Sequence, residues 1–110
     1  MTELELTPQQ IEAKRAAGES LCLIDCREPE EWALCRIEGA NLLPMHSTPA
    51  HLQHLDAQAE ETLLVVYCHH GVRSLNVVSW LRAQGVDNCV SMTGGIDRWS
   101  REIDPAVPRY

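Results

Sequence analysis

Two unbroken apolar runs, at residues 21–24 and 63–67, constrain the fold of this chain more than any other feature. Neither run alternates polar with apolar residues, so each is expected to form a strand buried on both faces, as in a parallel sheet. The second run is rich in β-branched and aromatic residues, which favour strands. Helical patterns separate the apolar runs, and this alternation predicts an α/β domain with a mostly parallel sheet and right-handed crossovers.

The flanking segments continue the alternation. Shorter strands are expected at residues 4–6, 41–43 and 89–91. Helices are expected over residues 8–17, 28–34, 47–55 and 74–84, and in a last segment that contains Ile96 and Trp99. No repeat, low-complexity tract or linker interrupts the 110 residues, so residues 1–110 are expected to form a single domain.

Charge and cysteine content exclude several classes of function. The formal net charge is −7, from 16 acidic and 9 basic residues, whereas nucleic acids and anionic membranes attract basic surfaces; neither is expected as a partner. No segment approaches the roughly 18 apolar residues of a membrane span, and residues 1–6 lack the features of a signal peptide. Five cysteines without a Cys-x-x-Cys pair indicate reduced thiols in the cytoplasm.

The most informative cysteine follows the second apolar run. Cys68 stands at the carboxyl end of that expected strand, and the loop from Cys68 to Arg73 leads directly into the helix expected at residues 74–84. This placement aims backbone N–H groups and the positive end of a helix dipole at the sulfur, so the thiol should ionise readily. The alternative, a buried structural cysteine, does not explain the arginine at this spacing. Cys68 is therefore the predicted nucleophile.

Other residues allow both a structural and a functional interpretation. Asp25 and Arg27 could orient the loop after Cys68, or could form a purely structural salt bridge. Cys26 lies at a strand end on the same edge of the sheet as Cys68; it could act as a resolving or relay thiol, although a buried core position is favoured. Cys35 is expected in a loop that could leave it exposed.

The remaining cysteines, histidines and tryptophans are expected to be structural. Cys22 and Cys89 fall inside expected strands and should be inert core residues. The histidines outside the loop have no second ligand cluster, so a solvated helix face is expected rather than a metal site; they are His46, His51 and His54. The tryptophans, Trp32, Trp80 and Trp99, are expected in the core or at its edge.

Three separated motifs follow one another along the chain: Leu-Ile-Asp-Cys-Arg-Glu-Pro-Glu-Glu-Trp at residues 23–32, Tyr-Cys-His-His-Gly-Val-Arg-Ser at residues 67–74, and Gly-Gly-Ile-Asp-Arg-Trp at residues 94–99. In this order they resemble signatures of the single-domain rhodanese (sulfurtransferase) family. The resemblance extends from about residue 21 to residue 99. It is interrupted at residues 35–40, where rhodaneses often have Gly-His-Ile-Pro-Gly-Ala and this chain has Cys-Arg-Ile-Glu-Gly-Ala.

The resemblance implies a doubly wound α/β domain around a five-stranded parallel sheet flanked by helices, and an enzyme that transfers sulfane sulfur. The Cys68 thiolate would take sulfur from a small anionic donor such as thiosulfate, and the resulting persulfide would pass it to cyanide, a thiol or a thioredoxin-like acceptor. No cofactor and no metal are expected. The expected substrate-binding residues supply backbone N–H groups or, for the arginine, a fixed positive charge; they are His69, His70, Gly71, Val72, Arg73 and Ser74.

Two alternatives to sulfur transfer remain. The Cys-x4-Arg loop is one residue shorter than the Cys-x5-Arg loop of cysteine phosphatases, which cradles a tetrahedral phosphate, so a phosphatase-like activity is disfavoured. The second alternative is a rhodanese-like binding or sulfur-relay module. A non-enzymatic interaction module implies a lost nucleophile, whereas this chain retains Cys68, so that interpretation is also disfavoured. The sequence does not determine the physiological donor and acceptor, the oligomeric state, or the roles of Cys26 and of the His69 and His70 imidazoles.

Overall fold

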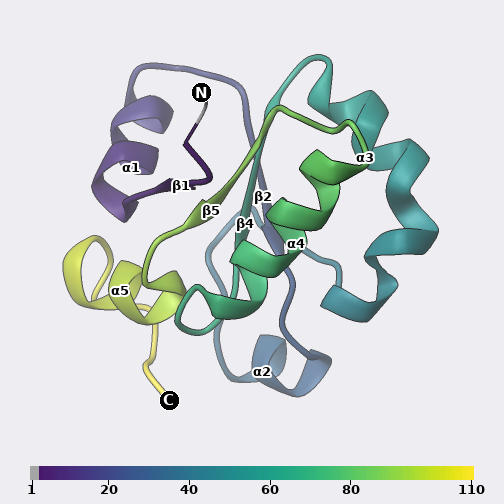
Figure 1. Cartoon of the computed structure of the whole chain (residues 1–110). Helices are drawn as coiled ribbons and strands as arrows, with labels where there is room; N and C mark the ends of the chain where they lie inside the picture. Colours follow the sequence, from purple (N-terminus) through teal and green to yellow (C-terminus); the bar gives the residue numbers. More distant parts are fainter. Residues whose placement is uncertain (1–2) are drawn as a thin grey trace.

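A five-stranded sheet runs through the centre of the computed structural model, which describes residues 3–110 (Figure 1). The strands are β1 (Glu5–Leu6), β2 (Leu21–Asp25), β3 (Asn41–Leu42), β4 (Leu63–Tyr67) and β5 (Cys89–Met92). Their order across the sheet is β1-β5-β4-β2-β3, and every neighbouring pair is parallel. The predicted five-stranded parallel sheet is confirmed. Met1 and Thr2, part of the N-terminal segment considered above, lie outside the described residues.

The two apolar runs form the centre of the sheet. β2 and β4 pair along their whole length, from Leu21 opposite Leu63 to Asp25 opposite Tyr67. Residues 64–67 of β4 are fully buried, because alternate side chains enter two separate hydrophobic clusters, one on each face of the sheet. Burial on both faces explains why these runs contain no polar alternation.

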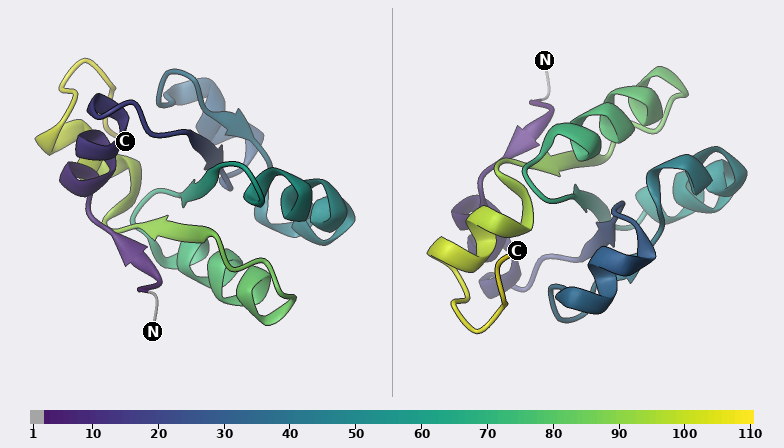
Figure 2. Two further views of the ribbon diagram at one scale, coloured as in Figure 1. Left: turned by 90° about the horizontal axis from the view of Figure 1, so that it is seen from above. Right: turned by 90° about the horizontal axis from the view of Figure 1, so that it is seen from below.

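Helices cover both faces of the sheet, as Figure 2 shows from above and below. The first face carries the 3₁₀ helix η1 (Met45–His51), α3 (Leu52–Ala59) and α4 (Val72–Ala83), and the second carries α1 (Pro8–Ala16) and α5 (Gly95–Glu102). The short helix α2 (Pro29–Leu34) lies beyond the ends of β2 and β4, at the bottom of Figure 1. None of the helices between residues 3 and 110 is both long and apolar enough to cross a bilayer.

The structure differs from the sequence-based expectations in two segments that follow loops. The helix expected over residues 47–55 is a 3₁₀ helix followed by α3, because Pro49 has no N–H to donate to an α-helical bond. Helix α4 begins at Val72, earlier than the expected residue 74, since Gly71 adopts φ +100° and serves as its N-cap. Consequently Arg73 and Ser74 belong to the first turn of α4.

Candidate active site

The Cys68 sulfur lies at the carboxyl end of β4 in a cradle of hydrogen-bond donors. The backbone N–H of Gly71 donates to Sγ at 3.0 Å and that of Ser74 at 3.4 Å, while the Ser74 hydroxyl oxygen lies 3.5 Å from the sulfur. Both N–H groups are at the start of α4, where the first amides of a helix have no partner within the helix. The positive end of the helix dipole therefore faces the sulfur, as the strand–loop–helix pattern predicted.

A second serine extends this cradle into the sheet. Ser91 is fully buried in β5, and its hydroxyl oxygen is 2.7 Å from that of Ser74. When Cys68 is ionised, the Ser74 hydroxyl can donate to the sulfur and accept a hydrogen bond from Ser91. Ser91 was not among the site residues predicted from the sequence, although a polar residue inside a strand buried on both faces was an available signal.

These contacts make Cys68 an acidic thiol. Its pKa is lowered to about 4, chiefly by a hydrogen bond with the Cys26 thiol and further by the side chain and backbone of Ser74 and the backbone of Gly71. Burial opposes the shift, because Cys68 is 1% exposed. The donors outweigh the loss of hydration, so Cys68 is a thiolate at neutral pH.

A lowered pKa predicts an unusual pH dependence of alkylation. An ordinary thiol reacts faster as pH rises through about 8.5, whereas the rate at Cys68 should rise near pH 4 and stay level between about pH 6 and 8, because ionisation is already complete. Replacing Ser74 by alanine removes one donor and should move the midpoint to higher pH. Mass spectrometry of Cys68 after brief iodoacetamide treatment measures both curves. An unchanged midpoint in Ser74→Ala would show that the hydroxyl does not stabilise the thiolate.

The Gly94–Gly95 turn holds the loop from its other side. The backbone N–H of Ile96 donates to the Cys68 carbonyl at 2.9 Å, and that of Asp97 donates to the His69 carbonyl at 3.2 Å. A Cβ on Gly95 would collide with both carbonyl oxygens. The loop thus lies between the amino ends of two helices: α4 donates to the sulfur, and α5 donates to the loop carbonyls.

Arg73 is paired with Glu31, an acidic residue that was not among the predicted site residues. Its guanidinium forms two hydrogen bonds with the Glu31 carboxylate of α2, at 2.7 and 2.9 Å. The hydrogen bonds from Arg73 lower the pKa of the Glu31 carboxyl group to about 2. The Arg73 side chain remains 32% exposed, and a guanidinium has five N–H donors, so this bidentate pair leaves donors for a substrate.

Tyr110 closes one side of the same region. Its ring stacks on that of His69 at a centroid distance of 3.9 Å, and its hydroxyl donates to Glu31 at 2.6 Å and accepts from Arg27 at 2.8 Å. The His69 Nε2 atom is buried and has no hydrogen-bond partner within residues 3–110. Tyr110 is 41 positions from His69 in the sequence, and no local pattern indicated that it would reach the site.

Asp25 and Arg27 form a buried ion pair at the carboxyl end of β2. Both side chains are fully buried, and the guanidinium forms bidentate hydrogen bonds with the carboxylate, the shortest of 2.6 Å. Arg27 also donates to the backbone carbonyl of Cys35 at 2.6 Å. Cys35 is only 7% exposed, so the expectation that its loop could leave it exposed was wrong; the bond to Arg27 draws that loop onto the sheet.

The structure brings residues 68–74 together at one edge of the sheet, but their side chains differ in exposure. Gly71 and Ser74 are buried, Arg73 is partly buried, and the Val72 side chain is 71% exposed, so only the backbone of Val72 is placed to serve the loop. Within residues 3–110 there is no group of three or more His, Cys, Asp or Glu side chains that could hold a metal ion.

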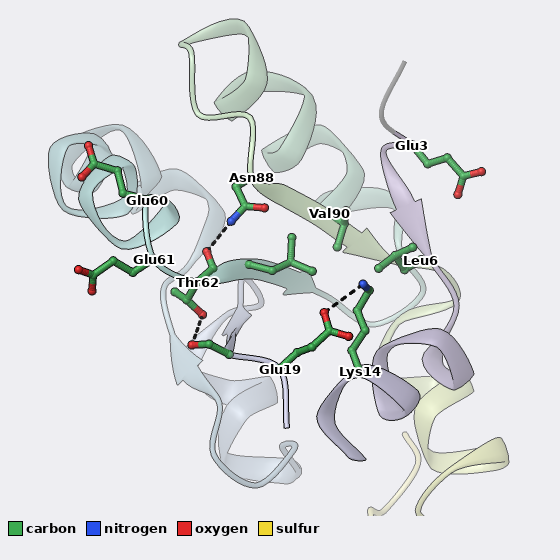
Figure 3. A pocket seen from close by; sticks show the side chains of 11 residues that line it. Glu3, Leu6, Lys14, Glu19, Glu60, Glu61, Thr62, Asn88 and Val90 are labelled. Carbon is green, nitrogen blue, oxygen red and sulfur yellow. Dashed lines mark hydrogen bonds and ion pairs between the residues drawn. The ribbon is translucent and has the colours of Figure 1, made fainter. Parts of the chain in front are cut away.

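A separate pocket lies at the opposite end of the sheet, where β2, β4 and β5 begin. Figure 3 shows acidic side chains around it, with Lys14 bonded to Glu19. No cysteine lines this pocket, and its glutamate side chains would repel an anionic substrate. The reactive chemistry therefore belongs to the other end of the sheet.

Comparisons with known proteins agree with this geometry. A family model for the rhodanese-like domain matches residues 7–102. The thiosulfate sulfurtransferase GlpE of Haemophilus influenzae is 36% identical over the full length of both chains. The human single-domain sulfurtransferase TSTD1 superposes with a TM-score of 0.77 at 25% identity, covering 92% of this chain and 98% of the human one.

Similarity also extends to parts of larger proteins. The probable adenylyltransferase/sulfurtransferase MoeZ of Mycobacterium tuberculosis is 30% identical over 105 residues, which are 96% of this chain. The match spans only 26% of MoeZ. The same domain thus occurs both as an entire protein and as a fraction of a longer one.

Proposed function

Because this chain belongs to the rhodanese-like domain family, we propose that it is a sulfurtransferase in which Cys68 carries the transferred sulfur as a persulfide. The observation that carries the proposal is the cradle around Cys68: two backbone N–H groups and a hydroxyl converge on a single buried sulfur. Two relatives that match this chain over 94% or more of both lengths are named sulfurtransferases, which supports the same activity here.

The proposed reaction has two steps. The Cys68 thiolate attacks the outer sulfur of a small anionic donor such as thiosulfate, and the rest of the donor leaves with the electron pair of the broken S–S bond. A thiophilic acceptor, cyanide or a thiol, then removes the terminal sulfur and restores the thiolate. The donors at the start of α4 stabilise the anionic sulfur in both steps, as an oxyanion hole stabilises developing charge.

Intact-mass measurement tests this proposal directly. Incubation with thiosulfate should increase the mass of the chain by one sulfur atom, and subsequent cyanide should remove that increase and produce thiocyanate. Peptide mapping should locate the added sulfur on Cys68. A chain that gains no sulfur from thiosulfate, from an organic persulfide or from a polysulfide would contradict the proposed activity.

Arg73 should determine how well an anionic donor binds. Replacing it by alanine removes a charge-assisted contact, which typically contributes about 1.5–3 kcal/mol, so kcat/KM for thiosulfate should fall roughly tenfold to hundredfold. The value for an uncharged sulfur donor should fall much less. Arg15→Ala, which removes an exposed charge from α1, is the control. Equal losses of kcat/KM for both donors would show that Arg73 positions the loop through its bond to Glu31 and does not bind the donor.

The acceptor and the cellular location are also proposals. All five cysteines are free thiols, which suits the reducing conditions of a cytoplasm. Cys68 is only 1% exposed, so the acceptor must present a small or protruding nucleophile, such as a low-molecular-weight thiol or the exposed cysteine of a thioredoxin-like protein.

A further inference from the structure

A second thiol that the proposed two-step reaction does not use lies directly beside Cys68. Cys26 follows β2 as Cys68 follows β4, and its backbone N–H donates to the Tyr67 carbonyl at 3.0 Å. Because Asp25 is paired with Tyr67, the two cysteines occupy the next position of the same parallel register. Neighbouring strands are about 4.8 Å apart, which lies within the range of roughly 4.4–6.8 Å between the Cα atoms of a disulfide.

The two side chains also share one environment. Cys26 and Cys68 are each 1% exposed and belong to the hydrophobic cluster between the sheet and helices α3 and α4. The Cys26 thiol is close enough to hydrogen-bond with the Cys68 sulfur, and this bond, together with burial, raises the pKa of Cys26. The proton shared by the two sulfurs therefore stays with Cys26 while Cys68 is ionised.

No other cysteine has this relationship with Cys68. Cys22 lies on the same face but is paired with Leu64, well before the end of β4. Cys35 belongs to the cluster on the opposite face of the sheet. Cys89 lies at the start of β5, where its thiol donates to the Val86 carbonyl at 3.3 Å.

We propose that Cys26 is a resolving cysteine, which attacks the Sγ atom of persulfidated Cys68, forms a Cys26–Cys68 disulfide and releases the terminal sulfur as hydrosulfide. This inference rests on the proposed function, since it starts from the persulfide. The S–S bond of the persulfide breaks as the new S–S bond forms, and the leaving sulfur keeps the electron pair. The two cysteine sulfurs are oxidised by two electrons in total, and the sulfane sulfur is reduced to sulfide.

The step needs no external oxidant or base. The thiol proton of Cys26 accompanies the departing sulfur, and the N–H groups of Gly71 and Ser74 face the sulfur centre at which charge shifts. A dithiol reductant then returns the disulfide to two thiols by exchange. Cys26 would thus give the protein a route by which sulfur leaves as free sulfide when no acceptor is bound.

The experiment follows a single turnover without acceptor. The protein is loaded with thiosulfate, freed of donor by rapid desalting and quenched in acid at intervals for intact-mass analysis without reductant, while released sulfide is measured. In the unsubstituted protein the persulfide should convert into a chain that lacks two thiol hydrogens, with one equivalent of sulfide. Peptide mapping should show Cys26 joined to Cys68, and dithiothreitol should restore both thiols.

The Cys26→Ser variant keeps a hydroxyl that can donate to Cys68, whereas Cys26→Ala loses this donor and should load sulfur more slowly. Once loaded, both variants should retain the persulfide at least about tenfold longer, because neither can form the disulfide. Cys22→Ser, a substitution on the same strand and face, should behave like the unsubstituted protein. Equal persulfide lifetimes with and without Cys26, or sulfide release without the Cys26–Cys68 bond, would overturn the resolving role and leave the proposed function intact. Absence of a persulfide in every variant would overturn both.

Discussion

Replacing Cys68 by serine should eliminate sulfur transfer, with a loss of at least about a thousandfold in kcat/KM, or about 4 kcal/mol of transition-state stabilisation. A serine hydroxyl in the same cradle is not ionised at neutral pH and does not form a persulfide. The remaining cysteines are not placed to substitute for it, because the backbone N–H groups at the amino end of α4 donate to the sulfur at position 68. A thiosulfate–cyanide assay measures the loss.

Cys22→Ser provides the control for this substitution. Cys22 is a partly buried cysteine of β2 whose thiol accepts a hydrogen bond from Gln58, far from the carboxyl edge of the sheet. This variant should keep full activity and should gain one sulfur atom in mass from thiosulfate, whereas Cys68→Ser should gain none. Undiminished turnover by Cys68→Ser would mean that the nucleophile is elsewhere.

Replacing Gly95 by alanine should be nearly as damaging to activity, although Gly95 contributes no side chain to the chemistry. The new Cβ would lie 2.5 Å from the His69 carbonyl oxygen and in collision with that of Cys68, which are backbone atoms that cannot rotate away. Overpacking of this kind costs about 1–3 kcal/mol of folding stability. A shift of the loop by about 1 Å would lower kcat/KM by roughly a hundredfold.

Gly18→Ala is the control that distinguishes the effect of this collision from the effect of backbone strain. Gly18 also has a positive φ, +80°, but a Cβ there would have no atom within 4 Å. Its variant should lose about 1–2 kcal/mol of stability from the left-handed conformation alone and retain its activity. Thermal unfolding and the sulfurtransferase assay distinguish the two. If Gly95→Ala were no less active than Gly18→Ala, the contact between the Gly94–Gly95 turn and the loop would not control catalysis.

The sequence predicted the central sheet and the nucleophile because both leave local signals. Residues 63–67 are apolar without alternation since they are buried on both faces, and Cys68 follows them directly. The edge strands were less predictable: β1 and β3 have only two residues each, too few to show periodicity. Their position is determined by pairing with β5 and β2.

The surroundings of the nucleophile could be predicted only in part. Glu31, Tyr110 and Ser91 reach the site from other elements, at separations of 42, 79 and 17 residues from their bonded partners. Local sequence patterns do not predict contacts between residues that are far apart in the sequence. The Cys26–Cys68 contact could be anticipated only as a shared sheet edge, because the register that aligns the two cysteines depends on the full pairing of β2 with β4.

The attachment of the Cys68 loop to α5 has a consequence for the newly made chain. The acidity of Cys68 depends in part on Ser74, and the loop that joins these two residues is held by the backbone N–H groups of Ile96 and Asp97. A chain that has not yet docked its last helix therefore carries an ordinary thiol, mostly protonated at neutral pH. Thiolates are the form that oxidants and electrophiles attack. The reactive sulfur is consequently shielded from chemical damage during synthesis, and becomes vulnerable only when the enclosing structure is complete.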